Sequence, residues 1–237
     1  MDFKLGVIIV GSLLWDEKPI RQKWRLACIK DINSRISVPI KIRYGRQSES
    51  RENTYTMILS NHVDTQLGQG LIFESADLIK SFKNLEKQAF ALARAEGIWK
   101  EDEKEPKISK SWGTVGLLLN PSIDKKNKVN ADLIRTRWTE LHKQHSSGFK
   151  FSDYQIENEE SVIDEDGFLN IGWTKEMDDF DLLVATPTVP KPKRSLTARE
   201  VAGAIRNKKY SDYFDKNRSN QITTFQDEEI TSLLRAE

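Results

Sequence analysis

The stretch that decides the expected fold is Val7-Ile8-Ile9-Val10-Gly11-Ser12-Leu13-Leu14-Trp15. Its apolar, β-branched first half predicts a buried strand over residues 4–12. A Gly-Ser pair after a strand lets the backbone turn sharply and present consecutive N–H groups, which commonly bind a carboxylate or phosphate. The alternative is an ordinary turn without a ligand. We expect Gly11-Ser12-Leu13 to lie at the mouth of the largest cavity, at the end of a central strand.

The composition limits the classes of partner. The 237 residues include 37 Lys and Arg and 36 Asp and Glu, so the formal net charge is +1. That balance argues against nucleic-acid binding through bulk charge. The single Cys28 excludes an intramolecular disulfide and indicates a reducing compartment. No run approaches the roughly 20 apolar residues that cross a bilayer, so we expect a cytoplasmic protein without a membrane partner.

Apolar periodicity and turn residues predict the order of the remaining elements. A capping box, Thr197-Ala198-Arg199-Glu200, predicts the start of one helix. The other expected elements are strands at 38–44, 54–60, 70–74, 114–119 and 180–186, and helices at 75–97, 130–145 and 227–234. Strands and helices in this order indicate an α+β fold, and we expect a single domain over residues 1–237.

A second candidate binding feature is the basic stretch that follows the strand at 38–44. Arg43, Arg46 and Arg51, together with Ser48, lie near the expected end of that strand. Guanidinium groups bind carboxylates and phosphates through forked, charge-assisted hydrogen bonds. The sequence therefore predicts an anion-binding clamp here, with a solvated strand face as the alternative.

Charge is unevenly distributed along the chain. Residues 19–51 carry nine basic and two acidic side chains, whereas Asp153–Asp181 carries eleven acidic side chains and one lysine. One interpretation is two solvated faces that attract each other. The other is an anion site in the first region and, in the second, a surface for a basic protein partner.

Taken together, several of these motifs resemble the gamma-glutamylcyclotransferase-like superfamily. The similar stretches are Gly11–Trp15, the pattern Arg43-x-x-Arg46-x-Ser48-x-x-Arg51, Gly70–Phe73 before a helix, and parts of 193–214. The resemblance implies a mixed β-barrel-like sheet with flanking helices and a long insertion around residues 100–181. It also implies that backbone groups of the Gly-Ser-Leu turn hold the substrate. Together with the expected arginine clamp, this gives the predicted substrate-binding residues: Gly11, Ser12, Leu13, Leu14, Arg43, Arg46, Ser48 and Arg51.

The resemblance further implies a reaction that needs no metal or cofactor. In active members a glutamate takes a proton from the substrate's amino group, which attacks its own γ-carbonyl and releases 5-oxoproline. The position that matches this base is Ala89, which cannot accept a proton, and Val10 stands where the family often has tyrosine. Glu86 and Glu96 on the same expected helix are the alternative bases.

Three hypotheses of function follow from the sequence. The first is a divergent cyclotransferase-type enzyme acting on a γ-glutamyl amide, and the second is a non-catalytic module that binds a small, anionic, amino-acid-like ligand. The third is an interaction protein whose acidic segment, Asp153–Asp181, binds a basic partner. The absence of a base at Ala89 weakens the first hypothesis and does not affect the second.

Overall fold

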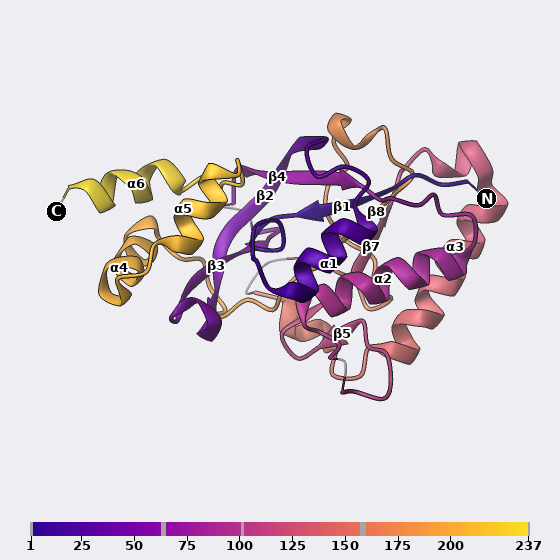
Figure 1. Ribbon diagram of the computed structural model, residues 1–237, viewed down its shortest axis with the longest axis horizontal. Coiled ribbons are helices and arrows are strands. Elements are labelled where there is room, and N and C mark those ends of the chain that lie inside the picture. Colours follow the sequence, from indigo (N-terminus) through magenta and orange to yellow (C-terminus); the bar gives the residue numbers. More distant parts are fainter. Residues whose placement is uncertain (1, 63–64, 101, 157–159, 237) are drawn as a thin grey trace.

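A mixed sheet forms the centre of the computed structural model, which describes residues 2–62, 65–100, 102–156 and 160–236 (Figure 1). Over these residues the sheet is six-stranded, in the order β3-β2-β4-β1-β8-β7. The fold is therefore α+β. The strands are β1 Leu5–Ile9, β2 Arg35–Ser48, β3 Thr54–Leu59, β4 Leu67–Glu74, β7 Gly116–Leu119 and β8 Leu182–Ala185, and a separate short pair is formed by β5 Ser109–Lys110 and β6 Gly113–Thr114.

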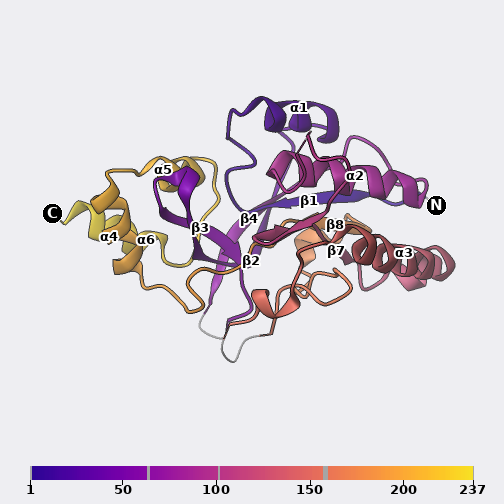
Figure 2. The ribbon, with the colours of Figure 1, turned by 90° about the horizontal axis from the view of Figure 1, so that it is seen from below.

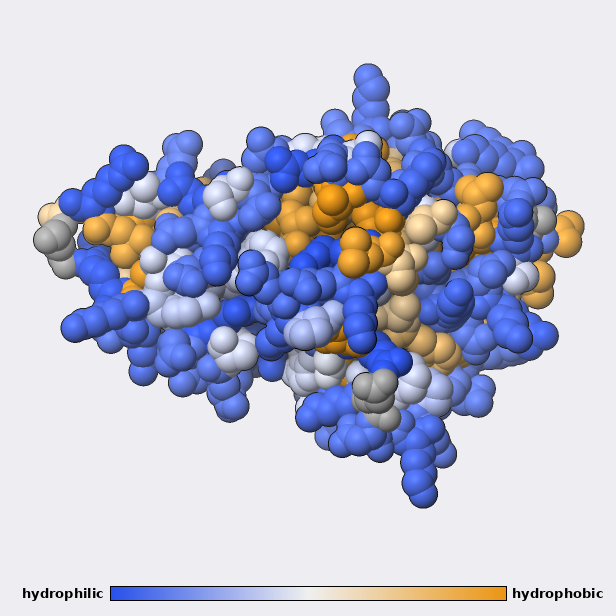
Figure 3. Space-filling view, in the orientation of Figure 1, coloured by the Kyte–Doolittle hydropathy of each residue, from blue (hydrophilic) through white to orange (hydrophobic). Residues whose placement is uncertain are grey.

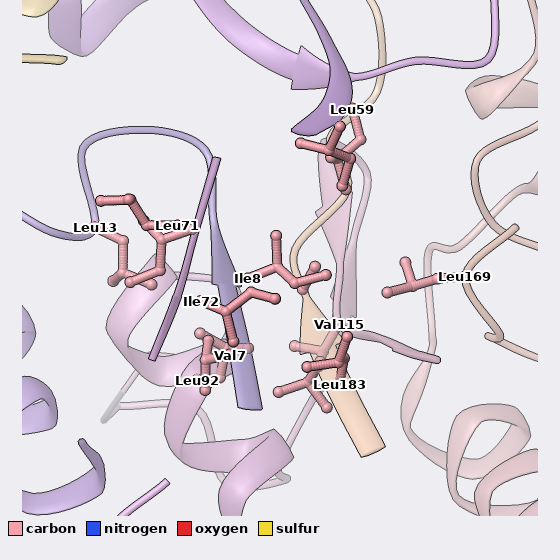
Figure 4. Packing of buried hydrophobic residues seen from close by; sticks show 14 of the residues in the cluster. Val7, Ile8, Leu13, Leu59, Leu71, Ile72, Leu92, Val115, Leu169 and Leu183 are labelled. Carbon is pink, nitrogen blue, oxygen red and sulfur yellow. The ribbon is translucent and has the colours of Figure 1, made fainter. Parts of the chain in front are cut away.

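β1 is an interior strand of the sheet, between β4 and β8, and every one of its residues is buried. It runs antiparallel to β4 and parallel to β8, with Val7 opposite Phe73 and Val184. Figure 4 shows Val7 beside Leu92, while Ile8 lies on the side of Leu183. A strand covered on both faces has a continuous apolar sequence rather than an alternating one. The expectation of a central strand is confirmed.

Two helices cover one side of the sheet. α1 spans Pro19–Cys28 and α2 spans Phe82–Glu96, and Figure 2 shows them side by side above β1. α1 was not expected from the sequence, although proline at its first position favours a helix start. α2 begins after Ser81 rather than at Ser75, and it ends at Gly97, whose φ of +82° suits glycine.

The remaining helices flank the two ends of the sheet. α3 spans Ile123–His145 and so begins before the expected residue 130, with a kink at Asn127. The C-terminal helices α4, α5 and α6 lie together beside β3 (Figures 1 and 2). Their bounds are Ala198–Lys208, Asp212–Ser219 and Asp227–Arg235. The capping box of Thr197 and Glu200 is present at the start of α4, as predicted. Within the described residues, no helix has the length and apolarity that a bilayer crossing requires.

Candidate functional site

A cavity of about 450 Å³ opens where β1 ends. Gly11, Ser12 and Leu13 line it, together with the end of β2, the last turn of α2, the segment after β8 and one residue of α5. Two broader hollows elsewhere on the described surface enclose about 690 and 790 Å³. The expectation that this turn borders the largest cavity is therefore wrong, because those shallower hollows are wider.

The turn after β1 is held by its own backbone. The Asp16 N–H donates to the Ser12 carbonyl at 2.8 Å, and the Leu14 N–H donates to the Gly11 carbonyl. Among the described residues, no acceptor is found for the backbone N–H groups of Gly11, Ser12 and Leu13. Successive backbone N–H donors without an acceptor, in residues that line a cavity, are an arrangement that can bind an anion.

Gly11 has a steric reason to be glycine. A Cβ built on Gly11 would lie 2.8 Å from the Tyr213 hydroxyl, which is closer than side chains normally approach. Tyr213 belongs to α5 and is fixed in place because its hydroxyl oxygen accepts a hydrogen bond from the Met57 N–H at 3.1 Å. Burial raises the pKa of Tyr213 to about 12, so its hydroxyl stays protonated near neutral pH. The C-terminal helices thus contribute one wall of the cavity.

Arg21 of α1 connects three parts of the site. Its Nη1 donates to the Ser12 Oγ at 2.8 Å, and its Nη2 donates to the Glu96 Oε2 at 2.7 Å. Its Nε donates to the Ala95 carbonyl at 3.2 Å. Because the donors of a guanidinium lie in one rigid plane, Arg21 can fix the distance between the turn after β1 and the end of α2.

A buried carboxylate supports the arginines from behind the cavity wall. Asp16 is 6% exposed, and its Oδ2 lies 2.5 Å from the Arg51 Nη2 and 3.2 Å from the Arg21 Nη1. Burial opposes ionisation of Asp16, but the Lys18 N–H, the Arg51 hydrogen bond and the charges of both arginines outweigh it and lower its pKa. Arg51 also lies 5.0 Å above the Trp15 ring. Asp16 is therefore ionised near neutral pH, and its carboxylate orients Arg21 and Arg51.

Glu96 is the candidate base that the structure places in the cavity lining. Its side chain is 18% exposed, and burial raises its pKa against the opposing charge of Arg21. Glu86 lies instead in the hollow between α1 and α2, and Ala89 is fully buried in the core. A carboxylate in a cleft whose pKa is raised by burial is a candidate for proton transfer.

Arg46 lies in another part of the cavity wall, at the end of β2. Its Nη1 donates to the Val189 carbonyl at 3.0 Å, and its guanidinium lies 5.6 Å above the Trp112 ring. Within the described chain, no carboxylate pairs with this half-buried cation. Thr186 and Thr188 also line the cavity, and their buried hydroxyls have no hydrogen-bond partner among the described residues.

The structure places most, but not all, of the predicted substrate-binding residues at the cavity. Gly11, Ser12, Leu13, Arg46, Ser48 and Arg51 all border the cavity. Arg43 does not, because it is 2% exposed and its Nε donates to the Ser60 Oγ at 2.9 Å. Leu14 does not either, because its side chain is buried in the core.

Several lining residues were missed by sequence reasoning: Lys18, Arg21, Trp112, Thr186, Thr188, Lys191 and Tyr213. Pro19 and the apolar spacing of Trp24 and Cys28 are a local signal that could have revealed α1 and therefore Arg21. The same signal locates Lys18, which directly precedes Pro19. For the others we find no local signal, because they reach the cavity from distant parts of the chain.

The acidic segment Asp153–Asp181 lies partly outside the described residues, which exclude 157–159. Two of its described members pair within the chain, since Asp166 binds Lys143 at 3.2 Å and Asp181 binds Lys126 at 2.9 Å. A basic protein partner for this segment stays a prediction. No family model, curated protein or solved structure matches the chain.

Proposed function

We propose that the cavity binds a small, anionic, amino-acid-like ligand. The observation that carries this proposal is Arg46, a half-buried guanidinium that no carboxylate neutralises within the described chain. Burial lowers the pKa of Arg46, yet an arginine stays protonated at any physiological pH. A cation in this position is stabilised when an anion binds beside it.

The rest of the lining supports an anionic ligand of small size. Among the described lining residues, five are cationic and two are carboxylates. The N–H groups of the Gly11–Leu13 turn supply unused donors, and the hydroxyls of Thr186 and Thr188 lie buried in the cavity wall without a partner among the described residues. A cavity of about 450 Å³ is in the range of sites for small molecules. Charge selects the ligand class, and the neutral donors orient the bound group.

The first test is calorimetry with a panel of acidic and neutral ligands: glutamate, γ-glutamyl dipeptides and inorganic phosphate as the acidic ligands, and N-acetylglutamine amide as the neutral one. We expect Arg46→Ala to weaken binding of the acidic ligands by about 1.5–3 kcal/mol, the range for a lost hydrogen bond to a charged group. The matched control is Arg35→Ala at the exposed start of β2, which should not change affinity. Equal affinity for acidic and neutral ligands, or unchanged binding by the Arg46 variant, would contradict the anion site.

A second candidate function is cyclotransferase-type chemistry, which the position of Glu96 favours. On this proposal the chain is a divergent gamma-glutamylcyclotransferase-like protein with an insertion around 100–181, and Glu96 is its base in place of Ala89. The Glu96 carboxylate takes a proton from the substrate's α-amino group, and that nitrogen forms a bond to the γ-carbonyl carbon. The amide C–N bond then breaks, and the departing amine takes the proton back from Glu96.

The second test separates catalysis from binding alone. The protein is incubated with γ-glutamyl dipeptides, and 5-oxoproline is measured by mass spectrometry. We expect Glu96→Gln to abolish release while dipeptide binding changes less, because the amide keeps its size but cannot accept the proton. Glu86→Gln is the matched control on the same helix and should retain full release. Binding without release by the parent protein would establish the non-catalytic alternative.

A further inference from the structure

A second hollow lies between α1 and α2, apart from the cavity at the β1 turn. It encloses about 790 Å³ and follows matching stripes of the two helices. On α1 the lining positions are spaced by three and four residues, as one helical face requires. Its apolar lining consists of Ile20, Trp24, Ala27 and Cys28 from α1, Phe90 and Ala91 from α2, and Trp99 after α2.

The floor of this groove is apolar. Trp24 and Cys28 are buried, and the rings of Phe90 and Trp99 pack edge to face with their centres 6.0 Å apart. Figure 3 shows hydrophobic side chains gathered near the middle of the face that carries α1 and α2, within a largely hydrophilic surface. An exposed apolar groove with a polar border is a common feature of a site for another molecule.

The border of the groove is strongly basic. Its charged members are Lys23, Lys83, Lys87 and Arg94, against the single carboxylate of Glu86. Across the described chain, none of the three lysines pairs with a carboxylate. Their charges are therefore available to a partner, and together they repel a basic one.

We propose that this groove is a docking site for an acidic, amphipathic helical segment of a partner protein. A third helix can pack its apolar face between α1 and α2, as side chains of one helix fit into the grooves of others. Acidic residues on the flanks of that helix then lie against Lys23 on one side and Lys83 and Lys87 on the other. The charge of the border selects the acidic partner, and the apolar floor supplies most of the buried surface.

The test uses a designed helical peptide of about four turns, with leucine and phenylalanine on one face and glutamate on both flanks. Binding to the full chain is followed by the backbone amide shifts of α1 and α2. We expect saturable binding that weakens with salt, since the border charges are exposed. A peptide with lysine in place of glutamate, and a glutamate peptide with alanine on its apolar face, should both bind at least about tenfold more weakly.

Charge reversal on the protein supplies the second arm. The double variant Lys23→Glu, Lys87→Glu should bind the acidic peptide at least about tenfold more weakly than the parent and should bind the lysine peptide more tightly. The matched control, Lys125→Glu with Lys208→Glu, reverses two exposed lysines on α3 and α4 and should bind like the parent. Thermal unfolding of each variant confirms that it is folded.

Four results would overturn the proposal. They are the absence of saturable binding up to about 1 mM, equal affinity for acidic and basic peptides, shifts that map away from α1 and α2, and unchanged binding by the charge-reversed variant. Sedimentation of the chain alone provides a further check. If the chain self-associates through α1 and α2, the occupant of the groove is a second copy of this chain, and the proposal of a partner helix is wrong.

Discussion

At the scale of single residues, Gly11 links the turn after β1 to the C-terminal helices. We expect Gly11→Ala to lower the free energy of unfolding by about 1–3 kcal/mol, the usual cost of forcing an extra group into a packed site. The reason is that the new methyl group would lie 2.8 Å from the Tyr213 hydroxyl and displace it from the Met57 N–H. The same variant should weaken ligand binding in the cavity, measured by calorimetry.

Gly203 offers the control for that prediction, because it lies within α4 and a Cβ there meets nothing within 4 Å. Gly203→Ala should stabilise the protein by about 0.5–1 kcal/mol through the better helix propensity of alanine. Chemical denaturation compares both variants with the parent. If the two substitutions shift the unfolding midpoint equally, the close approach of Tyr213 to Gly11 does not constrain that position.

At the scale of elements, the start of α6 contains a buried carboxyl group whose ionisation costs stability. Asp227 is 3% exposed; its Oδ1 accepts hydrogen bonds from the N–H and hydroxyl of Thr224, and its Oδ2 has no partner among the described residues. Burial raises its pKa from 3.8 to about 6. The protonated form is therefore favoured in the folded state, and its stabilisation is full below pH 3.8 and is lost as the pH rises through about 6.

Asp227→Asn should remove this pH dependence, because the amide keeps an acceptor oxygen for Thr224 and does not ionise. We expect the variant to gain stability relative to the parent between pH 4 and 6.5, by at most about 3 kcal/mol for a shift of this size. Urea unfolding at several pH values measures the difference. Glu228→Gln, at the exposed next position of α6, is the control and should follow the parent. This account would be contradicted if the parent became more stable relative to the Asp227→Asn variant as the pH rises.

At the scale of the whole molecule, the C-terminal helices and the sheet are expected to unfold together. Gln69 of β4 and Thr223 exchange two backbone hydrogen bonds of 2.8 and 3.0 Å, and the Phe214 ring packs 6.5 Å from the Tyr44 ring of β2. Phe214→Ala should therefore cost about 3–5 kcal/mol. Hydrogen exchange should show the same loss of protection in β2 as in α4 to α6. Phe225→Ala, at a 36% exposed ring, is the milder control.

A separate outcome would contradict that cooperativity. If only α4 to α6 lose protection while β1, β2 and β4 exchange as in the parent, the C-terminal helices form an independent unit. Tyr213 would then be a mobile wall of the cavity rather than a fixed one.

Local pattern was enough to predict the features that depend on neighbouring residues. The apolar run of β1, the turn at Gly11-Ser12 and the capping box at Thr197 each follow from residues adjacent in sequence. α1 was not predicted, although Pro19 and the helical spacing of its buried Trp24 and Cys28 indicate a helix. Arg46 was expected in a turn after the strand, but it lies within β2 near its end and borders the cavity. Arg43, three residues earlier on the same strand, has the same chemistry and is buried elsewhere.

By itself the sequence determined that a buried strand ends in a Gly-Ser turn and that arginines lie near the end of the next strand. Only the tertiary structure decided which carboxylate meets that turn. Glu86 and Glu96 lie on one helix but point in directions about 80° apart around its axis. The packing of α2 against α1 and β1 therefore turns Glu96 toward the cavity and Glu86 toward the groove. Helical periodicity gives the angle between two side chains, but their absolute direction depends on contacts with segments far away in the sequence.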